Sequence, residues 1–343
     1  QDGNIICQKN IEFKQYFPGN GWVEHNPNDI LKSTIDCIKY VINQSKVSPQ
    51  EIITAGITNQ RETIVAWDKK SGNPIYNAIV WQDRRTEDIC ENLRERNLQD
   101  MIQQKTGLII DPYFSASKIK WILENVEQAK SLLASNDLLV GTIDTWLIWK
   151  LTKEQRHFTD VTNASRTMIC NIINDCWDDE LLNIFDIPKE ILPEIKNSMD
   201  DFGVISSNFF GSEIPICGVA GDQQAAAFGQ LCNKKGMIKS TYGTGCFMLM
   251  NTGSEIYQSQ NKLLSTTAFK VQDKKLYALE GSIFNAGTTV QWMRDELSFF
   301  EKSEDIEDLA SLSKNDIIFS PALTGPGAPY WRSDIRGSIH GIT

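Results

Sequence analysis

The sequence lacks the features typical of nucleic-acid-binding and membrane-spanning proteins. Among its 343 residues, Lys and Arg number 34 against 44 for Asp and Glu, so the formal net charge is −10. Because an acidic chain is repelled by phosphate backbones and anionic lipid headgroups, we expect neither nucleic acid nor a membrane as a partner. No apolar run is long enough to cross a bilayer; the most hydrophobic stretch, residues 138–151, is interrupted by Asp144.

Cysteine and histidine are present, but without the spacing of a metal site or a disulfide framework. The eight cysteines are scattered with no CxxC pair, and the three histidines lie near no group of further ligands. This pattern predicts no metal site, a reducing compartment and a cytoplasmic location. The chain also has neither a P-loop nor a GxGxxG loop that opens a helix, so a dinucleotide-binding domain is disfavoured.

The alternation of apolar strands and amphipathic helices predicts a mixed α/β architecture with antiparallel hairpins. A first helix is expected after Asn26-Pro27, because apolar residues recur at helical spacing over residues 31–42. Further helices are expected at residues 86–96, 115–124, 144–151, 286–297 and 306–312. Strands are expected at residues 52–57, 63–67, 75–80, 138–140, 237–241, 246–250, 264–269 and 276–280.

The start of the chain and its middle mark two boundaries. Residues 1–4 are interpreted as a turn that enters a strand at residues 5–7, a hairpin without its first strand, and we therefore expect the chain to be a fragment. A domain boundary is expected near Leu231, which divides the chain into residues 1–231 and 232–343.

The segment GVAGDQQAAAFG, residues 218–229, is the most informative part of the chain. A strand end of small residues turns into an alanine-rich helix, which places Asp222 at or near the helix N-cap. The free backbone N–H groups there favour a negative charge, and α/β folds build their sites at the carboxyl ends of strands. The segment alone leaves open whether Asp222 serves a reaction or merely caps a helix.

Two glycine-containing turns are candidates for phosphate binding. Gly243, Thr244 and Gly245 lie between two apolar strands, where backbone N–H groups and a hydroxyl can form an anion nest. A plain hairpin turn also uses glycine and remains the alternative. The second turn, residues 285–288, contains Gly287 and opens a helix that carries Gln291, where the base or phosphates of a nucleotide can bind.

Arg61 and Glu62 follow a buried strand and provide a donor and an acceptor side by side. Such a pair suits a substrate with vicinal hydroxyls, each of which donates and accepts hydrogen bonds. A solvated ion pair is the alternative. Trp81 and Tyr113 lie near polar groups and can form the apolar wall of a small-polyol pocket, or else belong to the core.

Five segments together resemble the FGGY family of carbohydrate kinases, in the actin/Hsp70-like ATPase superfamily, and within that family the glycerol kinases. They are GITNQRET (56–63), NAIVWQDRRT (77–86), DPYFSASKIKWILEN (111–125), GVAGDQQAAAFGQL (218–231) and STYGTGCFMLMNTG (240–253). The resemblance implies two ribonuclease-H-like domains of actin-like type, with mixed sheets, an inter-domain cleft and a truncated second domain. It also implies ATP-dependent phosphorylation of glycerol to sn-glycerol 3-phosphate, with ATP and Mg²⁺.

The resemblance also assigns roles to individual residues. It implies a glycerol site in which Asp222 is the catalytic base and Trp81 and Phe247 pack against the carbon backbone. The polar members of that site are Arg61, Glu62, Tyr113, Asp222 and Gln223. The nucleotide contacts it implies are Gly243, Thr244, Gly287 and Gln291, with Thr244 at the ATP phosphates. Glycerol and ATP are then the expected partners, and a homo-oligomer is left open.

The sequence departs from the family pattern in three places. Family members begin with a strand and a phosphate loop whose Asp positions Mg²⁺, and that element would lie before Gln1. Residues 337–342 resemble only the opening of the second family signature. By its family we expect a glycerol kinase whose turnover is impaired or absent in this fragment while polyol binding survives; the alternatives are a non-catalytic polyol-binding fragment of a split or truncated gene, or another FGGY polyol or sugar kinase. Residues 206–214 lack a glycine-rich basic loop, so no inhibition by fructose 1,6-bisphosphate is expected.

Overall fold

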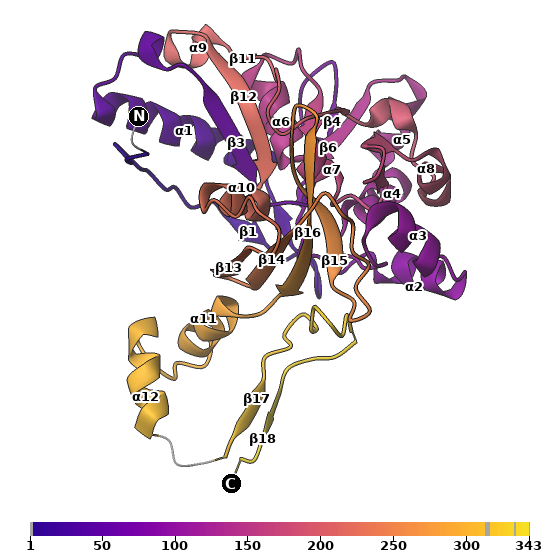
Figure 1. Cartoon of the computed structure of the whole chain (residues 1–343), viewed down its shortest axis with the longest axis vertical. Helices are drawn as coiled ribbons and strands as arrows, with labels where there is room; N and C mark the ends of the chain where they lie inside the picture. Colours follow the sequence, from indigo (N-terminus) through magenta and orange to yellow (C-terminus); the bar gives the residue numbers. More distant parts are fainter. Residues whose placement is uncertain (1–2, 313–315, 333, 343) are drawn as a thin grey trace.

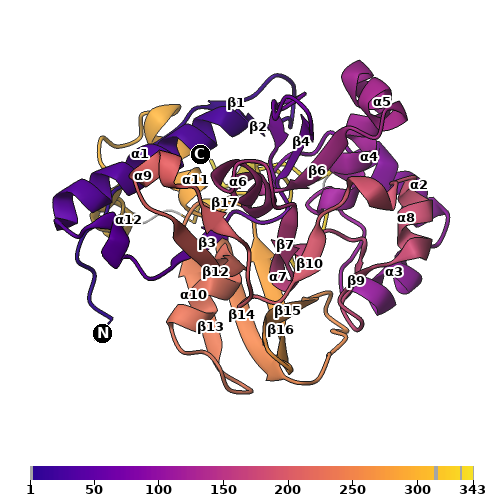
Figure 2. The same cartoon turned by 90° about the horizontal axis from the view of Figure 1, so that it is seen from above.

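The structure, a computed structural model, describes residues 3–312, 316–332 and 334–342. Strands from all parts of the chain lie between two groups of helices, which Figure 1 and Figure 2 show from two directions. The larger group comprises α2 (Glu87–Glu95), α3 (Gln99–Thr106), α4 (Ser115–Asn125), α5 (Glu127–Ala134) and α8 (Asp179–Phe185). The smaller group, on the other side, comprises α1 (Pro27–Ser45) and α9 (Ser207–Phe210).

A five-stranded sheet of order β1-β2-β5-β4-β6 forms the centre of the first part of the chain. On one of its faces Trp67 packs against Trp146 and Trp149 of α6 (Ile143–Leu151). Ile64 and Ala66 belong to a second core cluster, which α4 shares. Since successive residues of a strand point to opposite faces, this sheet has a core on each side. Its strands are β1 (Gln15–Tyr16), β2 (Glu24–His25), β5 (Ala78–Ile79), β4 (Ile64–Asp68) and β6 (Leu138–Thr142).

Two parallel strands bring distant parts of the sequence to one edge. β3 (Ala55–Asn59) pairs with β12 (Ile214–Gly221) so that Asn59 lies opposite Gly221. β11 (Val204–Ile205) pairs with the other side of β12. α10 (Asp222–Gly229) begins directly where β12 ends. Because parallel strands end at the same edge of a sheet, residues 60–62 and 222–223 meet there.

A four-stranded antiparallel sheet of order β13-β14-β16-β15 occupies the second part of the chain. The hydroxyl groups of Ser165 and Thr266 lie 2.9 Å apart and join this sheet to α7 (Val161–Ala164). Near the other end of β15 and β16, Asp175 forms ion pairs with Lys270 and Lys275. The sheet is thus anchored to the first part of the chain at two places. Its strands are β13 (Ile238–Tyr242), β14 (Cys246–Gly253), β16 (Lys274–Ile283) and β15 (Leu264–Val271).

The remaining elements are short, and several extend away from the main body at the bottom of Figure 1. The extended ones are α11 (Gly287–Asp295), η3 (Ser303–Asp305), α12 (Ile306–Leu312), β17 (Ile318–Ser320) and β18 (Ser338–His340). The others are η1 (Pro49–Glu51), η2 (Lys189–Ile191), β7 (Phe158–Asp160), β8 (Cys170–Asn171), β9 (Cys176–Trp177) and β10 (Glu194–Lys196). All eight cysteines are free. Among the described residues, no helix is both long and apolar enough to cross a bilayer.

Sequence patterns located most of the long elements and the mixed α/β class. The helix expected after Asn26 is α1, whose first turn is capped by the Asn26 side chain accepting from the Asn28 N–H at 2.9 Å. The hairpin expected at residues 63–80 is β4–β5, with Ile64 opposite Ile79. All four strands expected in residues 237–280 are present. The helices α3, α5 and α8 were not predicted, because each is only seven or eight residues long and has few apolar positions that repeat.

The strand predicted at residues 5–7 is wrong. Residues 3–14 contain neither helix nor strand, and Ile5 and Ile6 are exposed. An apolar run forms a strand only where a neighbouring strand accepts its backbone hydrogen bonds, and none lies beside it among the described residues. Gln1 and Asp2 of the predicted turn lie outside the described residues.

Candidate functional site

The edge where β3 and β12 end carries a buried cation beside an accessible carboxylate. The side chain of Arg61 is 1% exposed and that of Asp222 is 45% exposed, with Arg61 Nε 3.4 Å from Asp222 Oδ1. Arg61 Nε has no hydrogen-bond partner among the described residues. One donor of a buried guanidinium is therefore left for an acceptor that enters beside Asp222.

Glu62 adopts a backbone conformation that residues with a Cβ atom avoid. Its φ angle is +61°, and the Thr63 N–H donates to the carbonyl of Arg61 at 2.7 Å, so residues 61–63 form a γ-turn. The hydroxyl of Ser115 donates to the Glu62 carbonyl at 3.1 Å and holds the turn against α4. A left-handed conformation costs about 1–2 kcal/mol for such a residue. Strain of this kind is typical of sites where side chains must point in set directions.

Asp222 is the first residue of α10, as the sequence predicted to within one position. Its carboxylate accepts hydrogen bonds from the backbone N–H of Gln223 at 2.8 Å and from the Gln223 side-chain amide at 3.0 Å. The positive end of the helix dipole stabilises a negative charge at this position. Asp222 therefore both begins the helix and presents a carboxylate to the site.

A small cavity joins these groups to an aromatic wall. Its volume is about 40 Å³, well below the ~300 Å³ at the lower end of drug-sized pockets. The ring of Trp81 lies edge-on to those of Tyr113 and Phe247, with centroids 5.7 Å and 5.8 Å away. One side is thus apolar and the other polar, which suits a small molecule with a short carbon chain and several hydroxyl groups. The cavity is lined by Gln60, Arg61, Glu62, Trp81, Tyr113, Asp222, Gln223 and Phe247.

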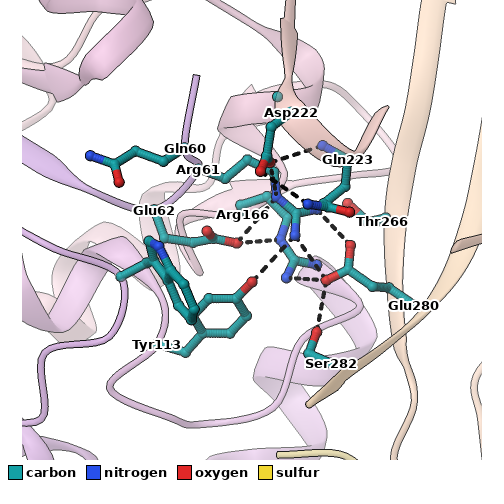
Figure 3. A network of polar contacts seen from close by, with 12 residues as sticks. Gln60, Arg61, Glu62, Tyr113, Arg166, Asp222, Gln223, Thr266, Glu280 and Ser282 are labelled. Atoms are coloured by element: carbon teal, nitrogen blue, oxygen red, sulfur yellow. Dashed lines mark hydrogen bonds and ion pairs between the residues drawn. The ribbon is translucent and has the colours of Figure 1, made fainter. Parts of the chain in front are cut away.

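Four buried charged side chains form a closed arrangement behind the cavity (Figure 3), which we call the buried charge ring: Arg61, Glu280, Arg166 and Glu62. Arg61 donates to the two carboxylate oxygens of Glu280 at 2.5 Å and 3.0 Å. Arg166 donates to Glu280 at 2.9 Å and to Glu62 at 2.7 Å. None of the four side chains is more than 2% exposed. Two cations and two anions alternate, so the ring has no net charge.

The two carboxylates of the ring differ in their electrostatic surroundings. Burial disfavours the charged form of Glu280, but Arg166 and Arg61 outweigh it and lower the pKa of Glu280 to about 2. For Glu62 burial is the larger effect, and it raises the pKa of Glu62 despite the neighbouring Arg61 and Arg166. Burial also raises the pKa of Tyr113, so its hydroxyl group stays a neutral hydrogen-bonding group. That hydroxyl accepts from Arg61 Nη2 at 3.2 Å.

A further buried cation holds Gln223. Lys239 of β13 is 1% exposed; its ammonium group donates to Gln223 Oε1 and, at 2.8 Å, to Thr241 Oγ1. Burial lowers the pKa of Lys239. With its oxygen bound by Lys239 and its amide bound by Asp222, the Gln223 side chain has a fixed orientation at the cavity.

The candidate nucleotide turn and the start of α11 bind each other. Gly287 N–H donates to the Gly243 carbonyl at 2.8 Å, and Thr288 donates to the Thr244 carbonyl through its N–H at 3.2 Å and its hydroxyl at 2.8 Å. These two N–H groups of α11 therefore already donate to carbonyl groups of the turn. The Thr244 N–H has no hydrogen bond among the described residues, and Thr244 is exposed. Gln291 is exposed further along α11.

The structure brings together seven of the residues singled out from the sequence and leaves four apart. The cavity contains Arg61, Glu62, Trp81, Tyr113, Asp222, Gln223 and Phe247. Gly243, Thr244, Gly287 and Gln291 lie on the turn and on α11, outside its lining. Sequence reasoning missed Arg166, Glu280 and Lys239, although a lone Glu inside the apolar strand LYALEG was a signal of a buried charged partner.

Comparisons with known proteins match the whole chain. The model of the FGGY family of carbohydrate kinases, N-terminal domain, matches residues 1–229, and that of the C-terminal domain matches residues 238–343. A glycerol kinase of Geobacillus sp. (strain WCH70) is 53% identical over 346 residues, which cover 100% of this chain and 70% of that protein.

Solved structures of the same kind superpose on the chain. The crystal structure of Plasmodium falciparum glycerol kinase with ADP aligns with a TM-score of 0.85 at 39% identity, covering 99% of this chain and 69% of that one. A ligand-bound xylulose kinase from Lactobacillus acidophilus aligns with a TM-score of 0.77 at 26% identity, covering 96% and 66%. The actin-like arrangement of two kinase domains inferred from the sequence is confirmed by these matches.

Proposed function

Since this chain belongs to the FGGY family of carbohydrate kinases, we propose that its small polar cavity binds glycerol for ATP-dependent phosphorylation of a primary hydroxyl group to give sn-glycerol 3-phosphate. The observation that carries the proposal is the Nε of buried Arg61, which has no hydrogen bond among the described residues and lies 3.4 Å from the half-exposed carboxylate of Asp222 and 3.8 Å from Glu62. A donor and an acceptor side by side, facing an aromatic wall, match a three-carbon chain with adjacent hydroxyl groups.

The proposed step is phosphoryl transfer in line with the attacking hydroxyl group. The hydroxyl oxygen forms a bond to the γ-phosphorus of ATP, the bond from that phosphorus to the β-γ bridging oxygen breaks, and ADP leaves. The proton of the attacking hydroxyl group passes to Asp222. Because the transition state is loose, correct placement of the hydroxyl group contributes most of the catalysis by the protein.

The other cavity residues orient glycerol. Arg61 Nε donates a hydrogen bond to a second hydroxyl oxygen, and Glu62 accepts a hydrogen bond from that hydroxyl group. The fixed amide of Gln223 and the hydroxyl of Tyr113 form the polar side of the cavity. Trp81 and Phe247 contact the carbon atoms of glycerol. All of the residues given a role here line the same cavity, which supports the assignment.

The nucleotide is assigned to the turn at Gly243 and Thr244 together with Gly287 and Gln291 of α11. The free Thr244 N–H and the exposed Thr244 side chain support a phosphate contact there. Division of the chain near Leu231 would place Asp222 in the first domain and this turn in the second.

Mg²⁺ is proposed to arrive with the ATP phosphates. Among the described residues no three His, Cys, Asp or Glu side chains gather into a complete metal site. A nucleotide-bound Mg²⁺ needs only one or two protein carboxylates, and Asp222 is assigned to the proton of the attacking hydroxyl group and not to the ion. When bound, the ion neutralises charge that develops on the transferred phosphoryl group.

Calorimetry and a coupled assay test the proposal. Glycerol is titrated into the protein and compared with xylulose and gluconate, since a cavity of this size should leave a longer chain poorly accommodated. Glycerol-dependent ADP release is then measured for the unchanged protein, Asp222→Asn and the control Asp179→Asn, which changes an exposed acid in the first turn of α8.

We expect Asp222→Asn to lower turnover by about 10²–10⁴-fold with little change in glycerol affinity, because a general base acts only in the chemical step. Asp179→Asn should behave like the unchanged protein. Normal turnover in Asp222→Asn would remove it as the base. Binding of glycerol without ADP release from the unchanged protein would identify a polyol-binding protein instead of a kinase, and tighter binding of xylulose would identify another sugar kinase.

A further inference from the structure

The polar atoms that face the cavity are oriented by two residues that do not line it. Glu280 and Arg166 are absent from the cavity wall, and both are fully buried. Each nevertheless forms hydrogen bonds to a side chain that does line the cavity, as Figure 3 shows. They therefore act on any bound molecule through Arg61 and Glu62.

Glu280 determines which atom of Arg61 is left for a ligand. Its two carboxylate oxygens take Nη1 and Nη2 of Arg61 in a bidentate pair. Nη1 and Nη2 also contact Gln224 and Tyr113, each at 3.2 Å. Only Nε has no hydrogen bond among the described residues, and it lies beside Asp222. A planar guanidinium held at both of its Nη atoms can point Nε in one direction alone.

Arg166 has the same effect on Glu62. Arg166 Nε donates to Oε1 of Glu62 at 2.7 Å, and among the described residues no hydrogen bond is made to Oε2. Oε2 is therefore the oxygen left to accept from a ligand. Because Glu62 is the strained central residue of a γ-turn, its side chain has few alternative directions once Oε1 is bound.

The ring spans the two matched regions of the chain. Glu280 lies on β16, within residues 238–343, and Arg61, Glu62 and Arg166 lie within residues 1–229. Neutralising Glu280 would leave three charges, two of them cations, in a place that water does not reach. The cations would then repel each other, and Arg61 would turn toward the remaining acids, Glu62 and Asp222.

We propose that Glu280 and Arg166 are positioning residues for the polyol site, which hold Arg61 Nε and Glu62 Oε2 in the direction of the ligand hydroxyl groups. The proposal rests on the proposed function, because glycerol is the ligand being oriented. It differs from a purely structural role for the ring in one respect: loss of Glu280 must change the affinity of the folded protein for glycerol as well as its stability.

Calorimetry with glycerol compares the unchanged protein, Glu280→Gln and the control Asp175→Asn. Asp175 also pairs with two cations, Lys270 of β15 and Lys275 of β16, and β16 is the strand that carries Glu280. Asp175 itself lies outside the cavity and the ring. We expect the dissociation constant to rise tenfold to a hundredfold in Glu280→Gln, the loss typical of a hydrogen bond to a charged group, and to stay within twofold in Asp175→Asn. Glu280→Asp, which keeps the charge, should recover part of the affinity.

A second readout needs no ligand. In nitrogen-15 NMR spectra, the Arg61 Nε–H signal is assigned by its disappearance in Arg61→Lys, and its exchange with water is measured. We expect faster exchange in Glu280→Gln and no change in Asp175→Asn. If the unchanged protein does not bind glycerol, the proposed function fails, and this exchange rate alone decides whether the positioning claim stands.

Unchanged glycerol affinity in Glu280→Gln with an unchanged Arg61 exchange rate would overturn the proposal. If Glu280→Gln does not fold, Arg166→Lys replaces it, because it keeps the charge while removing one of the two bonds that Arg166 makes to Glu280 and Glu62. A rise of about tenfold in its dissociation constant supports positioning, and a change within twofold refutes it.

Discussion

Two buried polar clusters in this molecule differ in how they accommodate charge. The buried charge ring pairs each carboxylate with arginine. The second cluster, which we call the buried acid cluster, contains Asp144 and Asp160 surrounded by hydroxyl and amide groups, with no ion pair among the described residues. Asp144 accepts from Thr142 at 2.5 Å, Thr159 at 2.7 Å and Asn59 at 3.3 Å.

The comparison shows that partners, and not burial alone, decide the charge state of a buried acid. Asp144 and Glu280 are both fully buried. Burial, with the charge of Asp160 adding to it, raises the pKa of Asp144 to about 7, whereas two arginines lower the pKa of Glu280 to about 2. Hydrogen bonds from neutral hydroxyl groups stabilise a carboxylate less than cations do. At neutral pH Glu280 is therefore charged, whereas Asp144 is in the middle of its titration.

Removing one cation from the buried charge ring should lower the free energy of unfolding more than any other change considered. Arg166→Met leaves Glu62 and Glu280 to share Arg61, and breaking a buried pair in this way costs about 3–5 kcal/mol in the free energy of unfolding. Denaturation by urea measures the loss, with Arg166→Lys as the charge-conserving control. A loss below about 1 kcal/mol would mean that water reaches the ring and screens it.

The two clusters should respond to pH in opposite directions. The pKa of Asp144 is raised in the folded state, from 3.8 to about 7, so its contribution to stability is complete below pH 4 and is lost as the pH rises through 7. The pKa of Glu280 is lowered from 4.5 to about 2, so its contribution is present above pH 4.5 and is lost only as the pH falls toward 2. Between pH 5 and 7 Asp144 should therefore change stability and Glu280 should not.

Comparison of Asp144→Asn with the unchanged protein isolates this effect. Relative to the variant, the unchanged protein should lose ~1 kcal/mol of unfolding free energy per pH unit between pH 5 and 7, with the slope decreasing toward pH 7 as Asp144 ionises in the folded state. The corresponding difference for Glu280→Gln should be flat over the same range. Urea denaturation at pH 5, 6 and 7 measures both, and parallel profiles for the two variants would contradict the contrast between the clusters.

An exposed ion pair provides the smallest expected effect. Lys32 and Asp36 form an i,i+4 pair on α1 at 3.2 Å, with side chains 79% and 43% exposed. Asp36→Asn should lower the unfolding free energy by no more than ~0.5 kcal/mol, because water screens the pair. Urea denaturation in low and high salt checks this; a loss of several kcal/mol would show that exposure does not separate weak from strong pairs here.

Residues that directly follow predicted strands could be located from the sequence, whereas the ion-pair partners that lie within other elements could not. Arg61, Glu62 and Asp222 follow strand ends, and parallel strands end at one edge, so local patterns sufficed to place them near one another. Glu280 lies 219 positions from Arg61, and nothing in the spacing identifies that pair. Likewise, the acid cluster joins Asn59 to Asp144 across 85 positions.

The incorrect prediction of a strand at residues 5–7 also results from a tertiary contact that the local sequence does not reveal. A short run of apolar residues indicates that a segment is able to form a strand, but the neighbouring strand that completes the ladder depends on the tertiary structure. The same limit explains the short helices α3, α5 and α8, which are stabilised by packing against the core more than by their own sequence.

The contact at Gly287 has a mechanical consequence. A Cβ atom at this position would lie 2.6 Å from the Gly243 carbonyl oxygen, so only glycine allows the hairpin and α11 to approach this closely. Four hydrogen bonds join the β13–β14 turn to the start of α11, since the Ala286 N–H also donates to the Thr244 carbonyl at 2.9 Å. A displacement of Thr244 would therefore also move the first residues of α11.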